Sequence, residues 1–343
     1  SKTKKQSNTF PNILTALNIC MKLCTEPWST VTIDYNGDIK PCLCADWNTV
    51  GAIGNILDKD LIEILDSEKL QLFKSQISSG NYSSCTEICP IKDHITDKDP
   101  SVIDNLTVPN KILLSVDLNC NLACESCRTH NIFSSKINND ALTILNKIYD
   151  FYYDKQVELQ FDGAGDLFAS KAYQHFLQKK FNDNFRFHII TNGNLLKKQK
   201  KIVENIKNNI ISIDVSIDAS NAETYKKTRG GVFQLVREGI EMCVSMGIKV
   251  NLSFVVQAKN YKELKTFWDL AVELKCHSVM FHLVRRWWHM DDTWWGKNSI
   301  EHLPKTERTI LFNQLSFLKK VEKHVTPDSV RVNMTGDLYN FKP

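Results

Sequence analysis

The stretch that decides the fold is Lys111-Ile-Leu-Leu-Ser-Val-Asp-Leu-Asn-Cys-Asn-Leu-Ala-Cys-Glu-Ser-Cys127, where an apolar run leads directly into three cysteines. The apolar run over residues 111–117 has the length and composition of a buried strand. Cys120, Cys124 and Cys127 would then lie in the loop that leaves this strand. Three thiolates this close together can hold three irons of a four-iron cluster. The fourth iron would stay open for a ligand that is not protein.

Strand-like and helix-like segments alternate from about residue 109 onward. This alternation predicts parallel β–α units joined by right-handed crossovers. Six units predict an α/β fold, an open and partial (β/α)6 TIM-like barrel, with its chemistry at the carboxyl ends of the strands. The expected strands are 112–117, 157–161, 185–191, 210–218, 249–256 and 278–284, and the expected helices are 139–150, 171–180, 197–208, 231–245 and 261–274.

The composition of the chain argues against some functions, such as nucleic-acid binding, and favours metal binding. The 343 residues carry a net charge of only +4 and no concentrated basic stripe, so we expect neither nucleic-acid nor membrane binding. The chain opens on the polar run Ser1-Lys-Thr-Lys-Lys5 and has no long apolar segment. Eleven cysteines in a chain without an export signal favour metal ligation in a reducing cytoplasm, which is the expected location.

Further polar and glycine-rich motifs follow the expected strands. They are Gly163-Ala164-Gly165-Asp166, Thr191-Asn192-Gly193, Val215-Ser216-Ile217-Asp218 and Lys227-Thr228-Arg229-Gly230-Gly231. Each motif taken by itself has an ordinary structural explanation. Such turns are common between strands and helices, Asp218 would cap a helix, and Arg229 would be a surface charge. Three cysteines by themselves could bind zinc or be buried free thiols. In this order and spacing, residues 108–284 resemble the radical S-adenosylmethionine (SAM) enzymes.

The resemblance implies a [4Fe–4S] cluster on the three cysteines and a role for each motif. Gly163, Ala164, Gly165 and Asp166 match the turn that receives the methionine amino group of SAM, and Asn192 lies in a common family turn. Ser216 and Asp218 match positions near the methionine carboxylate and ribose, Arg229 matches a partner of that carboxylate, and the strand ending at Val256 would run beside the adenine. One position departs from the family: Ser126 replaces an aromatic residue that packs on the cofactor.

The front of the chain carries the other cysteine group. Cys24, Cys42, Cys85 and Cys89 are the expected ligands of one auxiliary [4Fe–4S] cluster, with Cys20 and Cys44 as alternatives. Asn36-Gly37 predicts a hairpin that returns Cys42 toward Cys24. The spacing from Gly37 to Cys42 resembles the opening of a SPASM or twitch module, although such modules usually follow the catalytic domain. Four thiolates also suit zinc.

These features predict four segments. Residues 1–92 form an auxiliary iron–sulfur domain with a β-hairpin and a helix, 93–108 a linker, 109–285 the partial barrel, and 286–343 an aromatic-rich and helical extension. The extension begins with the tryptophan-rich run from Arg285 to Trp295, which suits either a binding surface or a buried interface. Cys243 and Cys276 are expected in the core, with hydrogen-atom donation by Cys276 as the sharper alternative.

The predicted function is that of a radical SAM oxidoreductase or maturase. It would cleave SAM reductively to a 5′-deoxyadenosyl radical, which abstracts a hydrogen atom from a peptide or protein side chain. The expected electron donor is a flavodoxin or ferredoxin. A dehydrogenase or epimerase of sugar-like small molecules is the alternative, and a zinc-stabilised binding module without catalysis is a third.

Overall fold

The computed structural model describes residues 21–42, 49–86, 89, 95, 97–98, 103, 106–128, 130–162, 164–286, 290–323 and 329–342. Cys20, Cys44, Gly163 and the segment Trp287–His289 lie outside the described residues.

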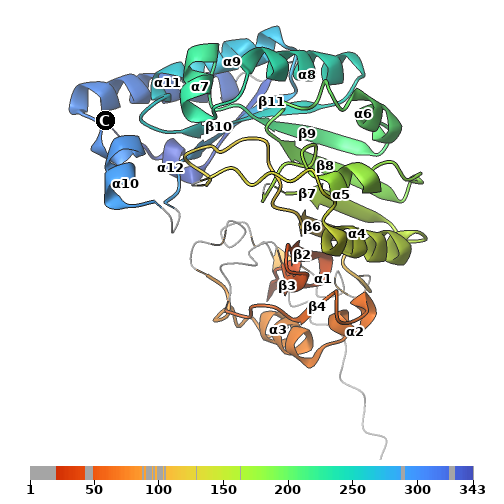
Figure 1. Cartoon of the computed structure of the whole chain (residues 1–343). Helices are drawn as coiled ribbons and strands as arrows, with labels where there is room; N and C mark the ends of the chain where they lie inside the picture. The colour runs from red at the N-terminus through yellow and green to blue at the C-terminus, as the bar shows by residue number, and fades with distance from the viewer. Residues whose placement is uncertain are drawn as a thin grey trace, which may run out of the picture.

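A sheet of ten strands forms the centre of the molecule (Figure 1), with the order β12-β11-β10-β9-β8-β7-β6-β2-β3-β4. From β12 to β2 every neighbouring pair is parallel. The six predicted strands are confirmed as β6 Lys111–Ser115, β7 Val157–Phe161, β8 Phe185–Thr191, β9 Ile210–Ser216, β10 Val250–Val256 and β11 Ser278–Leu283. The α/β class and the mostly parallel sheet are therefore as predicted.

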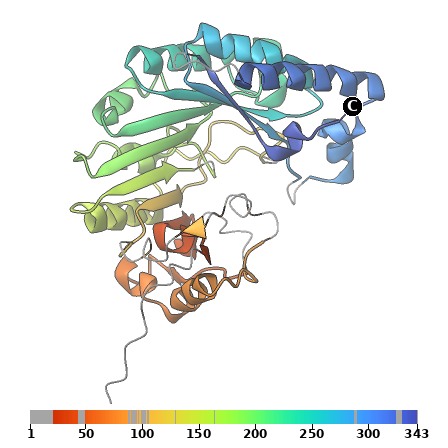
Figure 2. The ribbon, with the colours of Figure 1, turned by 180° about the vertical axis from the view of Figure 1, so that it is seen from behind.

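Helices cover one face of this sheet (Figure 1 and Figure 2). Along β10, Val250, Leu252, Phe254 and Val256 are buried, and Phe254 stacks edge-on against Phe267 of α9. Side chains alternate along a strand, so the residues between them face the opposite, concave side. The helices are α4 Asn139–Tyr152, α5 Lys171–Phe176, α6 Lys200–Ile206, α7 Ala222–Thr228, α8 Phe233–Ser245, η3 Tyr261–Glu263 and α9 Leu264–Glu273.

The amino-terminal region adds its hairpin to the same sheet. The hairpin joins β2 Thr30–Asp34 to β3 Asp38–Pro41, and Gly37 has a φ of 84° at the turn. This φ favours glycine, as the sequence predicted. β2 pairs in parallel with β6, so the sheet runs across the predicted domain boundary, which stays a prediction.

The remaining amino-terminal elements gather at this end of the sheet (Figure 2). They are β1 Met21–Lys22, paired with β5 Asp97–Lys98, then α1 Glu26–Ser29, β4 Gly54–Asn55, α2 Leu61–Leu65 and α3 Glu68–Ser78.

The carboxy-terminal region adds one more parallel strand at the edge of the sheet, beside β11, which the sequence did not predict. β12 Arg331–Met334 pairs with β11 and reads exposed–buried alternately. At four residues, it is too short for a clear alternation signal. Around it lie α10 Asp292–Asn298, η4 Ile300–His302, α11 Lys305–Lys323 and α12 Gly336–Tyr339. Within the described residues, no helix is both long enough and apolar enough to cross a membrane.

Candidate active site

The three-cysteine loop lies at the carboxyl ends of the parallel strands and lines a cavity of about 660 Å³. Cys120 and Cys124 are buried, whereas Cys127 is exposed. The Cys120 amide donates to the carbonyl of Ile132 at 2.7 Å, and the Cys127 amide donates to that of Cys124 at 2.9 Å. The backbone of the loop is therefore fixed while its three thiols face one cavity.

Gly165 lets the turn after β7 dock onto the start of the cysteine loop. A Cβ at this position would lie 2.6 Å from the carbonyl oxygen of Asn119 and closer still to that of Asp117. The close approach allows the Asp166 amide to donate to Asn119 at 2.7 Å. Arg128 completes the junction by donating to the carbonyls of Leu118 and Ala164 at 3.1 and 2.7 Å.

Asp166 uses its carboxylate inside the protein. One oxygen accepts from the Phe168 amide at 3.0 Å, and the other accepts from the Thr191 hydroxyl and the Asn192 amide, each at 2.8 Å. Burial raises the pKa of this carboxyl, while these hydrogen bonds act in the opposite direction. Asp166 therefore holds the turn after β8 against the turn after β7, so the backbone rather than this carboxylate is the group left to receive a ligand.

Asn192 links that second turn to the cysteine loop. Its side-chain amide donates to Cys120 Sγ at 3.7 Å and to Asn121 Oδ1 at 2.9 Å. A hydrogen bond to a ligating sulfur is one of the factors that set the potential of an iron–sulfur cluster. The predicted site residue Asn192 is thus positioned beside Cys120.

Asp218 and Arg229 form a buried ion pair at the edge of the cavity. Arg229 Nη1 lies 2.5 Å from Asp218 Oδ2, and Asp218 Oδ1 accepts from the Val255 amide at 2.7 Å. Asp218 has a φ of 57°, a conformation that aspartate tolerates better than most residues. The Nε of Arg229 is buried and has no hydrogen-bond partner in the described part of the chain. A guanidinium at the edge of a cavity suits a planar carboxylate of a ligand.

Strand β10 presents Val255 to the cavity rather than the predicted Val256. Val256 is fully buried on the helix-covered side, with Phe254, because side chains two residues apart share a face. The strand lies where the sequence predicted it, and the side chain that it turns toward the cavity is Val255. Ser216 and Ala164 line the cavity as expected.

Burial raises the pKa of the Cys120 and Cys124 thiols. The charges of Arg128 and Arg229, respectively, partly oppose that effect. Buried thiols that share one cavity suit a metal cluster, because coordination deprotonates them.

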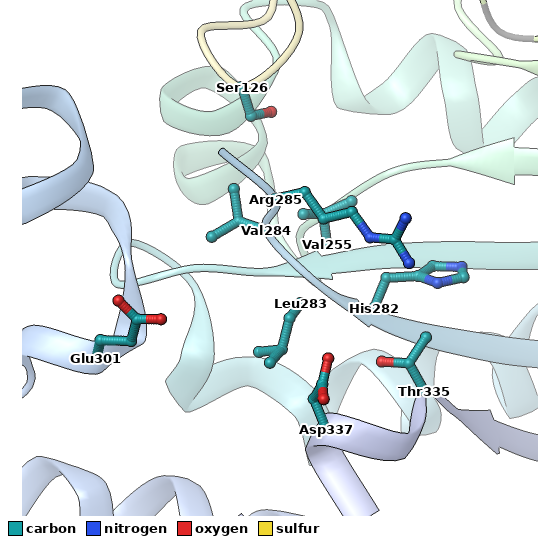
Figure 3. Close-up of a pocket in the computed structure, with 9 residues that line it drawn as sticks. All are labelled: Ser126, Val255, His282, Leu283, Val284, Arg285, Glu301, Thr335 and Asp337. Atoms are coloured by element: carbon teal, nitrogen blue, oxygen red, sulfur yellow. The ribbon is translucent and has the colours of Figure 1, made fainter. Parts of the chain in front are cut away.

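A second cavity of about 610 Å³ adjoins the first. Ser126 and Val255 line both, so the two spaces meet where the family usually has an aromatic side chain. The other lining residues are His282, Leu283, Val284, Arg285, Glu301, Thr335 and Asp337 (Figure 3). The sequence placed residues 282–284 at the end of the last expected strand and Arg285 at the start of the tryptophan-rich run. It gave no signal for Glu301, Thr335 and Asp337, because they are distant in the chain and follow no motif.

The auxiliary cysteines lie around the amino-terminal hairpin. Cys24 lies close enough to Cys85 and Cys89 for their charges to interact, and burial raises its pKa to about 11. The Cys24 amide donates to the Tyr82 hydroxyl at 3.2 Å, and the Cys85 amide donates to the Tyr82 carbonyl at 2.9 Å. The hairpin returns Cys42 to Thr30, whose carbonyl accepts from the Cys42 amide at 2.9 Å.

Cys243 and Cys276 are buried, and burial raises the pKa of each to about 12. Cys276 precedes the amino-terminal end of β11, whereas both cavities lie at the carboxyl ends of the strands. This placement removes the expectation that Cys276 donates a hydrogen atom.

In the tryptophan-rich segment, Trp295 donates to Glu301 at 3.0 Å, and the indole nitrogen of Trp294 is buried without a partner in the described residues.

An open parallel sheet with three cysteines in one loop at its strand ends is typical of a cluster-binding α/β protein. Residues 115–271 match the model of the radical SAM superfamily, and residues 24–90 match SPASM, an iron–sulfur cluster-binding domain. The chain belongs to the radical SAM superfamily and carries its SPASM domain before the catalytic domain. Its cofactors are SAM and [4Fe–4S] clusters, so the non-catalytic zinc module no longer applies.

The proteins that are similar to this chain have several different activities. A probable GTP 3′,8-cyclase of Methanococcus aeolicus is 27% identical over 46% of this chain and 53% of its own length. Fe-coproporphyrin III synthase of Methanosarcina barkeri is 35% identical over 28% of this chain and 24% of its own length. The chain thus spans about half or less of these relatives. The crystal structure of Streptococcus suis SuiB bound to S-adenosylmethionine has a TM-score of 0.47 at 15% identity, over 80% of this chain and 57% of SuiB.

Proposed function

We propose that this enzyme removes a hydrogen atom from a peptide or protein side chain seated in the second cavity. The observation that carries the proposal is the junction at Ser126 and Val255, which joins that cavity to the cysteine-lined one. When bound, the cluster and SAM supply a 5′-deoxyadenosyl radical, formed with methionine by one-electron cleavage of a carbon–sulfur bond.

The residues of the first cavity hold and orient the reagent. Cys120, Cys124 and Cys127 ligate the cluster, and Arg229 Nε receives the methionine carboxylate while Asp218 holds the guanidinium in place. The turn around Ala164 and Gly165 offers backbone groups to the methionine amino group, and Val255 packs beside the adenosine. Ser216 faces the same space and suits the ribose hydroxyls.

Cys24, Cys42, Cys85 and Cys89 hold the auxiliary cluster in this proposal. Such a cluster can accept the electron that remains when a substrate radical is oxidised with loss of a proton. Because β2 pairs with β6, the hairpin that precedes Cys42 is fixed to the strand that leads to the cysteine loop. A flavodoxin or ferredoxin is the proposed external electron donor.

The peptide substrate is proposed because the cavities form an extended series. A third cavity of about 230 Å³ shares Leu283, Val284 and Glu301 with the second. The continuous space suits a chain-like substrate that occupies several subsites, as peptide grooves do. The second candidate is a sugar-like molecule, favoured by the indole of Trp295 beside Glu301 in the third cavity.

The test is the formation of 5′-deoxyadenosine by the anaerobically reconstituted enzyme with dithionite and SAM. We expect pooled synthetic peptides to stimulate product formation and to acquire a mass change, whereas hexoses and nucleotide sugars do not. Stimulation by sugars alone would contradict the peptide proposal. A protein that carries clusters but forms no 5′-deoxyadenosine under any condition would contradict the radical proposal as a whole.

A further inference from the structure

Most of the residues that line the second cavity lie outside the two ranges that match family models, and only Ser126 and Val255 lie inside them. His282 to Arg285, Glu301, Thr335 and Asp337 all lie outside residues 24–90 and 115–271. β12 brings the last two into place, because the Thr335 amide donates to the Phe281 carbonyl of β11 at 3.1 Å. The polar side chains of this cavity, apart from Ser126, therefore lie outside the regions that the two family models describe.

The described residues that line this cavity include more carboxylates than cationic side chains. Arg285 is its one cation among the described lining residues, against the carboxylates of Glu301 and Asp337. Figure 3 shows the Arg285 guanidinium directed toward the His282 ring, with Asp337 beside Thr335 in another part of the cavity. Burial and the charge of Arg285 lower the pKa of His282, so this ring adds little positive charge near pH 7.

Two polar groups of the cavity have no partner. Within the described residues, the Asp337 side chain makes no hydrogen bond or ion pair, and Thr335 Oγ1 is buried without a hydrogen-bond partner. Glu301, in contrast, accepts from Trp295 Nε1. A carboxylate that loses water when a ligand enters needs a donor from that ligand, since an unpaired buried charge is costly.

We propose that the second cavity binds a positively charged nitrogen of the substrate, an ammonium or guanidinium group, at Asp337 with Thr335 beside it. This inference rests on the proposed role of the cavity as the substrate site. Arg285 repels the charged end, so the remainder of the substrate lies toward Ser126 and the reagent. In a peptide the group is a lysine or arginine side chain or the amino terminus, and in a sugar it is an amino group.

The experiment measures binding of two matched probe pairs to the SAM-loaded holoenzyme by anaerobic equilibrium dialysis without reductant. One pair is Nα-acetyl-lysine amide and its Nε-acetylated form, and the other is glucosamine and glucose. We expect the charged member of at least one pair to bind about tenfold or more tightly, as charge-assisted hydrogen bonds allow. Asp337→Asn should remove most of this preference, and Asp337→Glu should retain part of it.

Asp292→Asn is the matched control. Asp292 also lies in the first turn of a short helix, but it pairs with Arg286 away from the cavity. This variant should bind all four probes as the wild type does. Equal binding within both pairs, or a preference that survives in Asp337→Asn, would overturn the inference. A preference confined to glucosamine would support the cation site but contradict the peptide proposal.

Discussion

The two adjoining cavities differ in how their polar groups are satisfied. In the cysteine-lined cavity, Asp166 and Asp218 are buried, and their carboxylate oxygens already accept hydrogen bonds from the protein. In the second cavity, Asp337 is exposed and Thr335 Oγ1 has no partner within the described residues. A fixed, internally paired site suits a reagent that is always the same. An open site with unsatisfied groups suits recognition of a particular substrate.

The strongest way to break the first cavity is to remove a proposed cluster ligand. Cys124→Ala should reduce 5′-deoxyadenosine formation to background and lower the iron content from about eight to about four per chain, because only the auxiliary cluster persists. Iron analysis and product assay measure both effects. Cys243→Ala, which removes a buried thiol from helix α8, should keep about eight irons. An active Cys124→Ala protein would refute the proposed ligand set.

Arg229→Gln tests whether the unpaired Nε serves the reagent. We expect SAM binding to weaken about tenfold to a hundredfold, since a charge-assisted hydrogen bond is lost and Asp218 is left buried without its partner. Equilibrium dialysis with labelled SAM measures the change. Arg237→Gln removes the surface ion pairs with Glu273 and Glu241 and should leave SAM binding unchanged. Unaltered affinity in Arg229→Gln would show that the carboxylate binds elsewhere.

Gly165→Ala sharpens the claim that the first cavity depends on close backbone packing. The added Cβ meets the carbonyls of Asp117 and Asn119, so we expect a loss of about 1–3 kcal/mol in unfolding free energy, or about 2–6 °C in apparent Tm. Thermal unfolding of the reconstituted protein is the measurement. Gly296→Ala in α10 meets no atom within 4 Å and should not destabilise the protein. Equal Tm values for the two variants would argue against the close packing.

The smallest expected effect concerns pH and the second cavity. Burial, followed by the charge of Arg285, lowers the pKa of His282 in the folded chain. The unfolded chain therefore takes up a proton first as the pH falls through about 6.5, and the unfolding free energy decreases. His282→Gln should flatten this dependence, by at most about 1.4 kcal/mol per pH unit. Urea unfolding between about pH 5.5 and 7.5 measures the slope, and an identical slope in both proteins would show that His282 does not titrate differently in the folded and unfolded chains.

The sequence by itself determined the sheet and the place of the reagent site. Parallel β–α units have a fixed handedness and bring their strand ends to one edge, so the motifs at residues 120–127, 191–193 and 216–218 had to meet. The hairpin at Gly37 followed from local turn chemistry in the same way. These signals lie within single elements and need no knowledge of distant contacts.

Only the tertiary structure decided which side chains pair and what forms the second cavity. The hydrogen bond from Thr191 to Asp166 depends on the direction in which each side chain points. The same is true of Val255, which faces the cavity where Val256 does not. The second cavity needs β12 beside β11, a pairing of two segments about fifty residues apart. Such long-range contacts follow from packing of the whole chain, because no local periodicity or motif specifies them.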